Sequence, residues 1–285
     1  MGVQWQAHVG FSRALIHPVE MTDTVEYRGA RAAKKVTKAG RVFAVGPPSY
    51  WLNVFTDLPQ AGGGTDEALP TREMADAIYR LRTITDDSSG SETLTWLRAL
   101  GVDLAIVDRA HFFTSPSRFA AAGKLVWSEG TESLYAVPRR SRSLAHVMPL
   151  AALIPATDMR VQHVQRYVAA LESDRFPEAT FRWLSTHSAQ IRAKLAAGQV
   201  ISVQVTHDPG WRAWGNGIEQ RIRKDGMGFM SIQPACRDCD IRLEFTESQE
   251  RSVCNLIACA CAASLALVAA WAIAAEPPGA RRTCR

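Results

Sequence analysis

The hydrophobic and polar positions divide the chain into two folded regions and one long apolar segment. Between residues 41 and 140, short apolar runs alternate with stretches of helical spacing. Between residues 175 and 251, apolar and polar side chains alternate with a period of two, and residues 252–275 carry no charge. This pattern predicts an α+β protein with a small layered α/β unit, an antiparallel β-sandwich and one C-terminal transmembrane helix.

The first folded region is predicted to contain a strand, two helices, a second strand and a hairpin. The apolar run 42–45 ends at a Gly-Pro-Pro break and indicates a strand. The first helix follows Thr71 and has apolar residues at every third or fourth position, namely Met74, Ala77, Ile78 and Leu81. The second helix is expected to be capped by Ser91 and to end at Gly101. A buried strand over 103–107 and a hairpin over 124–137 complete this unit, and residues 1–40 form an N-terminal segment with a short helix near 27–38.

The second folded region is predicted to be rich in strands. Residues 141–174 are expected to form a linker with one helix, since Val161, Val164, Val168 and Leu171 share a helical face. Alternation over 181–183, 189–195, 201–205 and 241–245 then indicates the strands of a β-sandwich over 175–251. Residues 196–199 are expected to close a hairpin between two of these strands, although 189–195 also fits a short helix.

Two turns in this region have specific sequence signatures. Pro209 fixes φ and Gly210 can adopt a positive φ, so the chain is expected to reverse there and to place Trp211 over the sandwich as a structural side chain. Asn216 and Gly217 form the strongest short hairpin signal in the chain.

The apolar segment 252–275 is long enough to cross a membrane. Its 24 residues would span about 36 Å as a helix, against a hydrocarbon core of about 30 Å. The alternative is a buried core helix. Arg281, Arg282 and Arg285 follow the segment, whereas Arg251 before it is offset by acidic residues. Because positive charge is retained inside, we expect residues 276–285 to be a short cytoplasmic tail, with the bulk extracytoplasmic at the inner membrane.

No signal peptide is visible before this span, since residues 1–10 lack an apolar core. The chain is therefore expected to be either a tail-anchored protein with its bulk in the cytosol or the end of a longer polytopic protein.

Charge and composition exclude several classes. The net charge of +5 and the eight tryptophans exclude global disorder, and the arginines are too scattered for a nucleic-acid partner. The densest basic cluster, Arg139, Arg140 and Arg142, is expected to lie in a solvated turn.

One loop carries side chains suited to sugar recognition. Three consecutive glycines, 62–64, are surrounded by an aromatic ring and by amide and carboxylate groups, and the candidate glycan-binding residues are Trp51, Asn53, Asp57, Gln60 and Asp66. The alternative is a structural loop whose glycines satisfy positive-φ positions. No phosphate-loop or dinucleotide motif is present, so no cofactor is expected, and catalytic residues remain unknown.

The cysteines fall into two groups. Cys236 and Cys239 lack the second ligand pair of a zinc site and the strand-to-helix setting of a redox motif, so we expect a local disulfide and no metal. Cys254, Cys259 and Cys261 lie in the apolar segment and are expected to act as small packing residues.

The turns and strands together resemble a known family. Residues 201–217 and 223–234, with upstream stretches 50–64 and 134–140, resemble the C-terminal extracytoplasmic region of bacterial YfhO-like polytopic membrane proteins, which are similar to GT-C glycosyltransferases. The resemblance covers residues 41–275, but the polytopic N-terminal half, where such enzymes carry catalytic carboxylates, is absent.

The resemblance implies a membrane-anchored, non-catalytic binding or structural module in envelope glycan or lipid-linked sugar metabolism. Its implied partners are the lipid bilayer, a glycan or lipid-linked sugar, and a polytopic membrane protein encoded upstream. The alternatives are a membrane glycosyltransferase that uses a lipid-linked sugar donor and a cytosolic tail-anchored adaptor.

Overall fold

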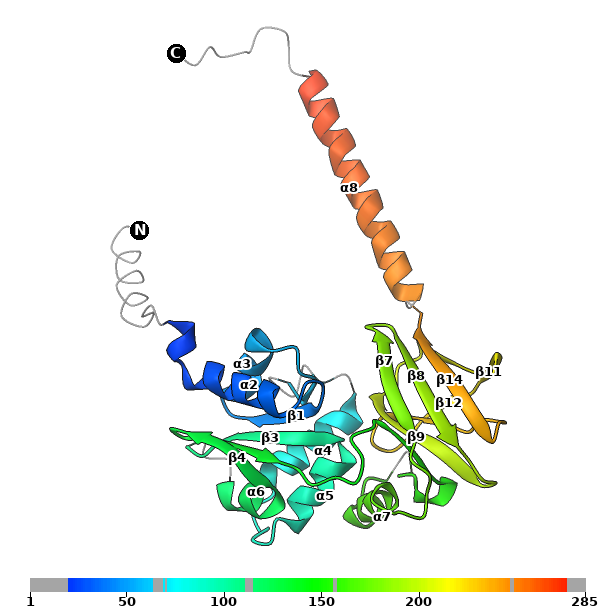
Figure 1. Ribbon diagram of the computed structural model, residues 1–285. Coiled ribbons are helices and arrows are strands. Elements are labelled where there is room, and N and C mark those ends of the chain that lie inside the picture. Colours follow the sequence, from blue (N-terminus) through cyan, green and yellow to red (C-terminus); the bar gives the residue numbers. More distant parts are fainter. Residues whose placement is uncertain are drawn as a thin grey trace.

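A computed structural model describes residues 20–63, 69, 71–110, 115–155, 158–246 and 249–275. The fold is mixed α/β: one mixed five-stranded sheet with helices, two antiparallel sheets of five and four strands, and one long apolar C-terminal helix (Figure 1). The predicted order of the layered unit, the sandwich and the apolar helix is confirmed.

The first sheet has the strand order β2-β1-β3-β5-β4. Its strands are β1 (Arg41–Val45), β2 (Gln60–Ala61), β3 (Val102–Asp108), β4 (Lys124–Glu129) and β5 (Glu132–Ala136). β1 pairs in parallel with β2 and β3, whereas β5 is antiparallel to β3 and β4. Alternate residues of β1 enter different cores: Val42 and Ala44 lie on one face, and Phe43 and Val45 on the other. The sheet is therefore the middle layer of three.

Helices cover both faces of this sheet (Figure 1). α2 (Val25–Val36), which follows the short 3-10 helix η1 (Met21–Asp23), and α3 (Pro48–Phe55) pack on the first face through Ala30, Ala33 and Leu52. α4 (Arg72–Thr83), α5 (Ser91–Ala99) and α6 (Pro116–Ala122) cover the second. The expected apolar face of α4 is confirmed, because all four of its predicted residues are buried.

The start of α5 differs from the expected one. Ser91 lies inside the helix, and the N-cap is Gly90 at φ 69°. The orphan amides are satisfied by Asp87, whose carboxylate accepts hydrogen bonds from the amides of Thr93 and Glu92. Gly90 is required for close packing as well, since a Cβ there would lie 2.5 Å from the backbone nitrogen of Ala122.

The sandwich consists of two antiparallel sheets, ordered β11-β10-β14-β8-β7 and β12-β13-β9-β6. The first holds β7 (Thr180–Ser185), β8 (Ser188–Lys194), β10 (Trp211–Gly215), β11 (Ile218–Gln220) and β14 (Asp238–Phe245). The second holds β6 (Ala145–Pro149), β9 (Gln199–Thr206), β12 (Ile222–Lys224) and β13 (Phe229–Ile232). β6 comes from the range expected to be a linker, together with a short 3-10 helix η3 (Leu150–Ala152) and α7 (Val161–Leu171).

The expected hairpin at residues 196–199 is wrong. β8 pairs with β7 and β14, and β9 pairs with β6 and β13, so this connection crosses from one sheet to the other. Residues 189–195, for which a short helix was the alternative, form strand β8 up to Lys194. Alternation identifies a strand but carries no information on which strand is its neighbour.

The four-stranded sheet is buried on both faces. Ile201 and Val203 of β9 face the sandwich core, whereas Val200 belongs to the core that continues under α7 into the α/β unit. Tyr167 of α7 is fully buried in this second core. The two folded regions therefore share one hydrophobic core.

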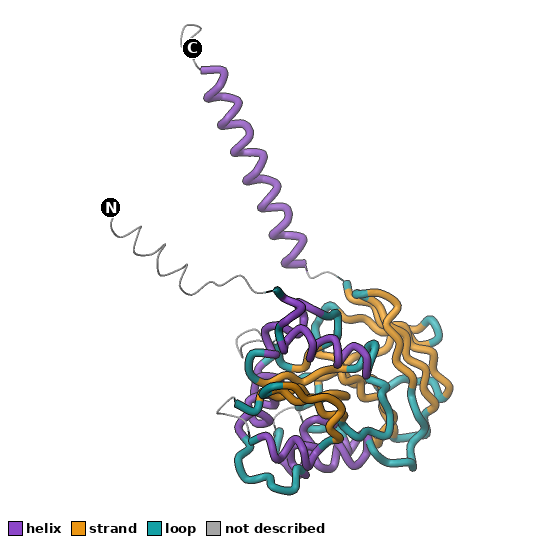
Figure 2. The backbone as a smooth tube through the Cα atoms, turned by 60° about the vertical axis from the view of Figure 1, so that its left-hand side comes forward, coloured by secondary structure: helices purple, strands orange, loops and turns teal. Residues whose placement is uncertain are grey.

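The last helix, α8 (Gln249–Ala275), extends away from the folded body (Figures 1 and 2). Within it, residues 253–271 are long and apolar enough to cross a membrane, and none of them is buried against the rest of the protein. The predicted core-helix alternative is therefore wrong.

Candidate functional site

The two ends of the sandwich have different chemistry, and β14 defines them. This strand begins beside the disulfide and ends at Phe245, a few residues before α8. In the antiparallel register, Trp211 lies opposite Phe245, and Gly215 lies opposite Ile241. The turn between β7 and β8 is at the same end as Phe245, because Ser188 pairs with Glu244. We call this end the α8 end and the other the disulfide end.

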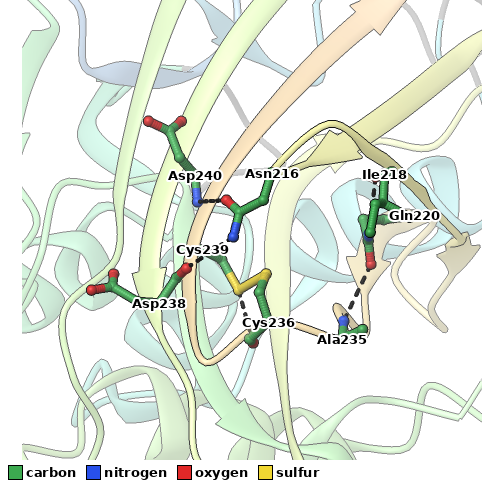
Figure 3. The surroundings of a disulfide bond; sticks show 8 residues. All are labelled: Asn216, Ile218, Gln220, Ala235, Cys236, Asp238, Cys239 and Asp240. Atoms are coloured by element: carbon green, nitrogen blue, oxygen red, sulfur yellow. Dashed lines mark hydrogen bonds between the residues drawn. A yellow bond between two sulfur atoms is a disulfide. The ribbon is translucent and has the colours of Figure 1, made fainter.

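At the disulfide end, a disulfide joins Cys236 to Cys239 (Figure 3). Asn216 lies beside it at φ 51°, followed by Gly217 at φ 82°, which is the geometry that a two-residue hairpin requires. The Asn216 side chain accepts a hydrogen bond from the amide of Asp240 and donates one to the carbonyl of Asp238. The β10–β11 hairpin and the first residues of β14 are thus held together, which gives both features a structural role.

At the α8 end, a groove of about 400 Å³ opens between the edges of the two sheets. Its walls come from the β9–β10 turn and from the segment that links β11 to β12, and they consist of His207, Asp208, Pro209, Trp211, Arg212, Glu219, Gln220, Arg221 and Ile222. The groove therefore combines one indole with guanidinium, carboxylate and amide groups.

The groove has a balanced charge. Burial lowers the pKa of His207, with the nearby Lys224 charge adding to the effect, so this ring is neutral at pH 7. Arg212 and Glu219 lie 4.0 Å apart as an exposed pair, and Asp208 and Arg221 contribute opposite charges. These two positive and two negative groups therefore sum to zero net charge.

The Pro209–Gly210 turn forms one wall of this groove. The amide of Trp211 donates to the carbonyl of Asp208, as in a β-turn, and the amide of Gly210 donates to the Asp208 carboxylate. Gly210 does not need a positive φ, contrary to expectation. It is required because a Cβ there would lie 2.6 Å from the carbonyl oxygen of Thr246, the residue that follows β14.

Trp211 is half-buried and has two roles. Its ring packs edge-on against Phe245 at 5.3 Å and lies 6.2 Å from the ring of Trp183. The same side chain lines the groove. Trp211 is thus both a packing residue of the sandwich and an aromatic surface available to a ligand.

The four described members of the predicted glycan-binding group each have a contact within the fold. Trp51 is 46% exposed on α3 and stacks on Phe55. Asn53 donates to the carbonyl of Leu58, and Asp57 forms an ion pair with Lys34. Gln60 donates to the carbonyl of Ser49 and lines a cavity of about 220 Å³.

The remaining member of that group, Asp66, lies outside the described residues. Gly62 adopts φ 87°, as a structural loop requires. A side chain at position 62 would also lie 2.9 Å from Ile78, so glycine fits this position on both grounds.

The basic cluster at 139–142 is not a solvated turn. The side chain of Arg139 is 3% exposed and forms a buried ion pair with Asp103 at 3.0 Å. It also donates to the carbonyl of Gly101 and to the side chain of Gln204. Arg140 pairs with Asp174, while Arg142 is exposed.

Gln204 is the centre of a polar network between the two folded regions. Its side-chain oxygen accepts from Arg139 and from His146, and its amide donates to the carbonyls of Arg98 and Ala99. Burial, together with the Arg139 charge, lowers the pKa of His146 to about 4, so its ring is neutral at pH 7. Every polar atom of Gln204 has a partner, which gives this network a structural role.

Sequence reasoning missed the polar walls of the groove. The Asn216–Gly217 hairpin could have indicated these walls. Pairing the residues on either side of the turn places Trp214 opposite Glu219, as the structure has it, and continuing the same register places Arg212 opposite Arg221 on the same face. Within the described residues, no group of three or more His, Cys, Asp or Glu side chains could hold a metal ion. Searches of protein families, curated proteins and solved structures found no match to this chain.

Proposed function

We propose that this chain is a membrane-anchored extracytoplasmic module that binds glycan at the membrane surface. It acts as a non-catalytic part of envelope glycan or lipid-linked sugar metabolism, in line with the resemblance to YfhO-like proteins. The observation that carries the proposal is the position of the groove: it opens at the end of the sandwich from which α8 leaves.

The apolar helix supports membrane anchoring. Residues 253–271 would span about 28 Å as a helix, close to the thickness of the hydrocarbon core. Its large apolar side chains, including Leu256, Leu265 and Trp271, are exposed, and in water such a surface would be unfavourable. Trp271 lies near the far end of this segment, where a tryptophan suits the membrane–water interface.

Two features support an extracytoplasmic body. Disulfides persist in oxidising compartments, and the Cys236–Cys239 bond lies in the folded body. The three arginines after the span, at positions 281, 282 and 285, favour a cytoplasmic tail.

The groove supports glycan recognition. Sugars bind where an apolar ring face lies next to polar groups that hydrogen bond their hydroxyls. Trp211 supplies the ring, and Arg212, Glu219, Gln220 and Arg221 supply donors and acceptors.

A glycan array probed with the full chain in nanodiscs tests this proposal. We expect binding to neutral glycans that falls at least tenfold in Arg221→Ala, an exposed position where the fold tolerates the change. Asp57→Asn is the matched control for the loop, because Asp57 is an exposed member of the predicted group, and it should leave binding unchanged. Absence of binding to any glycan contradicts the proposal, and loss of binding in Asp57→Asn alone would move the site to the loop.

A further inference from the structure

Two exposed apolar patches lie on the side of the body from which α8 leaves. The first is on α3 and consists of Tyr50, Trp51 and Val54; the second is at the end of β7 and consists of Trp183 and Leu184. Figure 1 shows both α3 and the sandwich end that carries α8 on this side. Large apolar side chains that remain exposed in contiguous groups mark an interaction surface.

The β7 patch is joined to the base of α8 by a chain of aromatic contacts. The ring of Trp183 packs edge-on against that of Phe181, with the ring centroids 5.0 Å apart. The Trp211 ring lies 6.2 Å from the Trp183 ring, and the Phe245 ring lies 5.3 Å from the Trp211 ring. The imidazole of His187 stacks on Phe245 at 6.1 Å. This aromatic row therefore ends on the last residue of β14.

The connection to α8 keeps this row close to the membrane. The four peptide steps from Phe245 to Gln249 span at most about 14 Å, and the four polar residues 249–252 at the start of α8 add about 6 Å. Phe245, at the end of the row, thus lies within about 20 Å of Val253, where the apolar segment begins. Membrane-spanning helices are commonly tilted, and a tilt toward this side would bring the row to the headgroup layer.

The α3 patch is separate in sequence and has the composition of a membrane interface. Tyr50, Trp51 and Val54 occupy the outer face of α3, whereas Leu52 on the inner face is buried. Tyrosine and tryptophan are enriched where a protein meets the headgroups, because their rings are apolar and their polar atoms remain hydrated. A body that touched the membrane only through α8 would leave this patch in water.

We propose that the folded body lies on the bilayer that α8 crosses, with the α3 patch and the β7 patch inserted at the boundary between headgroups and acyl chains. Both patches thus contact lipid. This inference depends on the membrane anchoring proposed above and fixes the orientation of the body, with the disulfide end pointing away from the membrane.

Depth-dependent fluorescence quenching in nanodiscs tests the orientation. In a full chain with Cys254, Cys259, Cys261 and Cys284 replaced by alanine, an environment-sensitive fluorophore is attached in turn to Leu184→Cys, Tyr50→Cys and Ile218→Cys. Ile218 is the matched control, since it is 67% exposed but lies at the disulfide end. A fourth probe at Val268→Cys, inside α8, reports anchoring alone.

We expect lipids brominated near the headgroup to quench the Leu184 and Tyr50 probes at least threefold more than the Ile218 probe. Equal, weak quenching at all three sites, with strong quenching at Val268, overturns the orientation and leaves the anchoring intact. A blue-shifted but unquenched Leu184 or Tyr50 probe also overturns it, because a protein then covers the patch. Failure to quench Val268 overturns the anchoring itself.

Discussion

Removing the Arg139 guanidinium tests the polar network between the two folded regions. Arg139→Ala would leave the Asp103 carboxylate buried without its cation and would remove donors from the Gly101 carbonyl and the Gln204 side chain. The amide of Arg41 still donates to the Asp103 carboxylate, so the charge retains one hydrogen bond.

The magnitude follows from this geometry. Breaking one partner of a buried ion pair costs about 3–5 kcal/mol, and both side chains here are at least nine-tenths buried. For a folded body of this size each kcal/mol lowers Tm by about 2–4 °C, which gives a decrease of roughly 6–20 °C. Arg142→Ala is the matched control, because Arg142 is exposed and three residues away; its Tm should change by less than about 2 °C.

Differential scanning fluorimetry of the full chain in nanodiscs measures both variants. Because the two regions share one core and this network, Arg139→Ala should shift a single transition rather than separate two. Equal Tm values for Arg139→Ala and Arg142→Ala would refute the reasoning. Two separate unfolding transitions, of which Arg139→Ala shifts only one, would refute it as well.

Three further results are expected. Gly210→Ala should destabilise the sandwich by about 1–3 kcal/mol in denaturant unfolding, because the new Cβ meets the Thr246 carbonyl. Gly63→Ala should be neutral, because no atom of the described residues lies within 4 Å of a Cβ at that position, and similar effects of the two variants would contradict the close packing. Burial, with the Glu73 charge adding to it, raises the pKa of Asp225 to about 7 from 3.8, so the folded state binds a proton that the unfolded chain releases, and stability should fall as pH rises from about 4 to about 7. Asp225→Asn keeps an oxygen for the amides of Met227 and Phe229 and should flatten this decline in unfolding curves at pH 5 and pH 8; an unchanged slope would show that Asp225 is ionised in the fold. Mass spectrometry after alkylation without reduction should find Cys236 and Cys239 unmodified and Cys284 alkylated, and alkylated Cys236 would contradict the disulfide.

Local patterns in the sequence predicted most of the elements, because each depends on residues close together. The apolar face of α4 and the Asn216–Gly217 hairpin are determined within a few positions of the chain. The segment 48–55 was missed as a helix, because its prolines indicated a break. Proline at the first turn of a helix is in fact favourable, and α3 begins at Pro48.

Features that depend on distant residues were not predictable in this way. The residues next to Arg139 in the sequence are typical of a solvated turn. Its side chain is buried because Asp103 of β3 and Gln204 of β9, which are distant in the sequence, lie against it. Alternation over 201–205 identifies the strand β9 but does not show that Ser202 and Gln204 are buried, which follows because α7 and the α/β unit cover this face. The groove likewise needs the β9–β10 turn and the β11–β12 segment in one place, which no local pattern specifies.

Thiol labelling in spheroplasts tests the proposed topology most directly. In a chain that keeps the Cys236–Cys239 disulfide and carries Ile218→Cys with the other four cysteines replaced by alanine, a membrane-impermeant maleimide should label position 218 before lysis. A parallel chain that keeps only Cys284 besides the disulfide should be labelled only after lysis. If position 218 reacts only after lysis while Cys284 reacts before it, or if both require lysis, the body is not extracytoplasmic and the account of a membrane-anchored glycan-binding module outside the cytoplasm is contradicted.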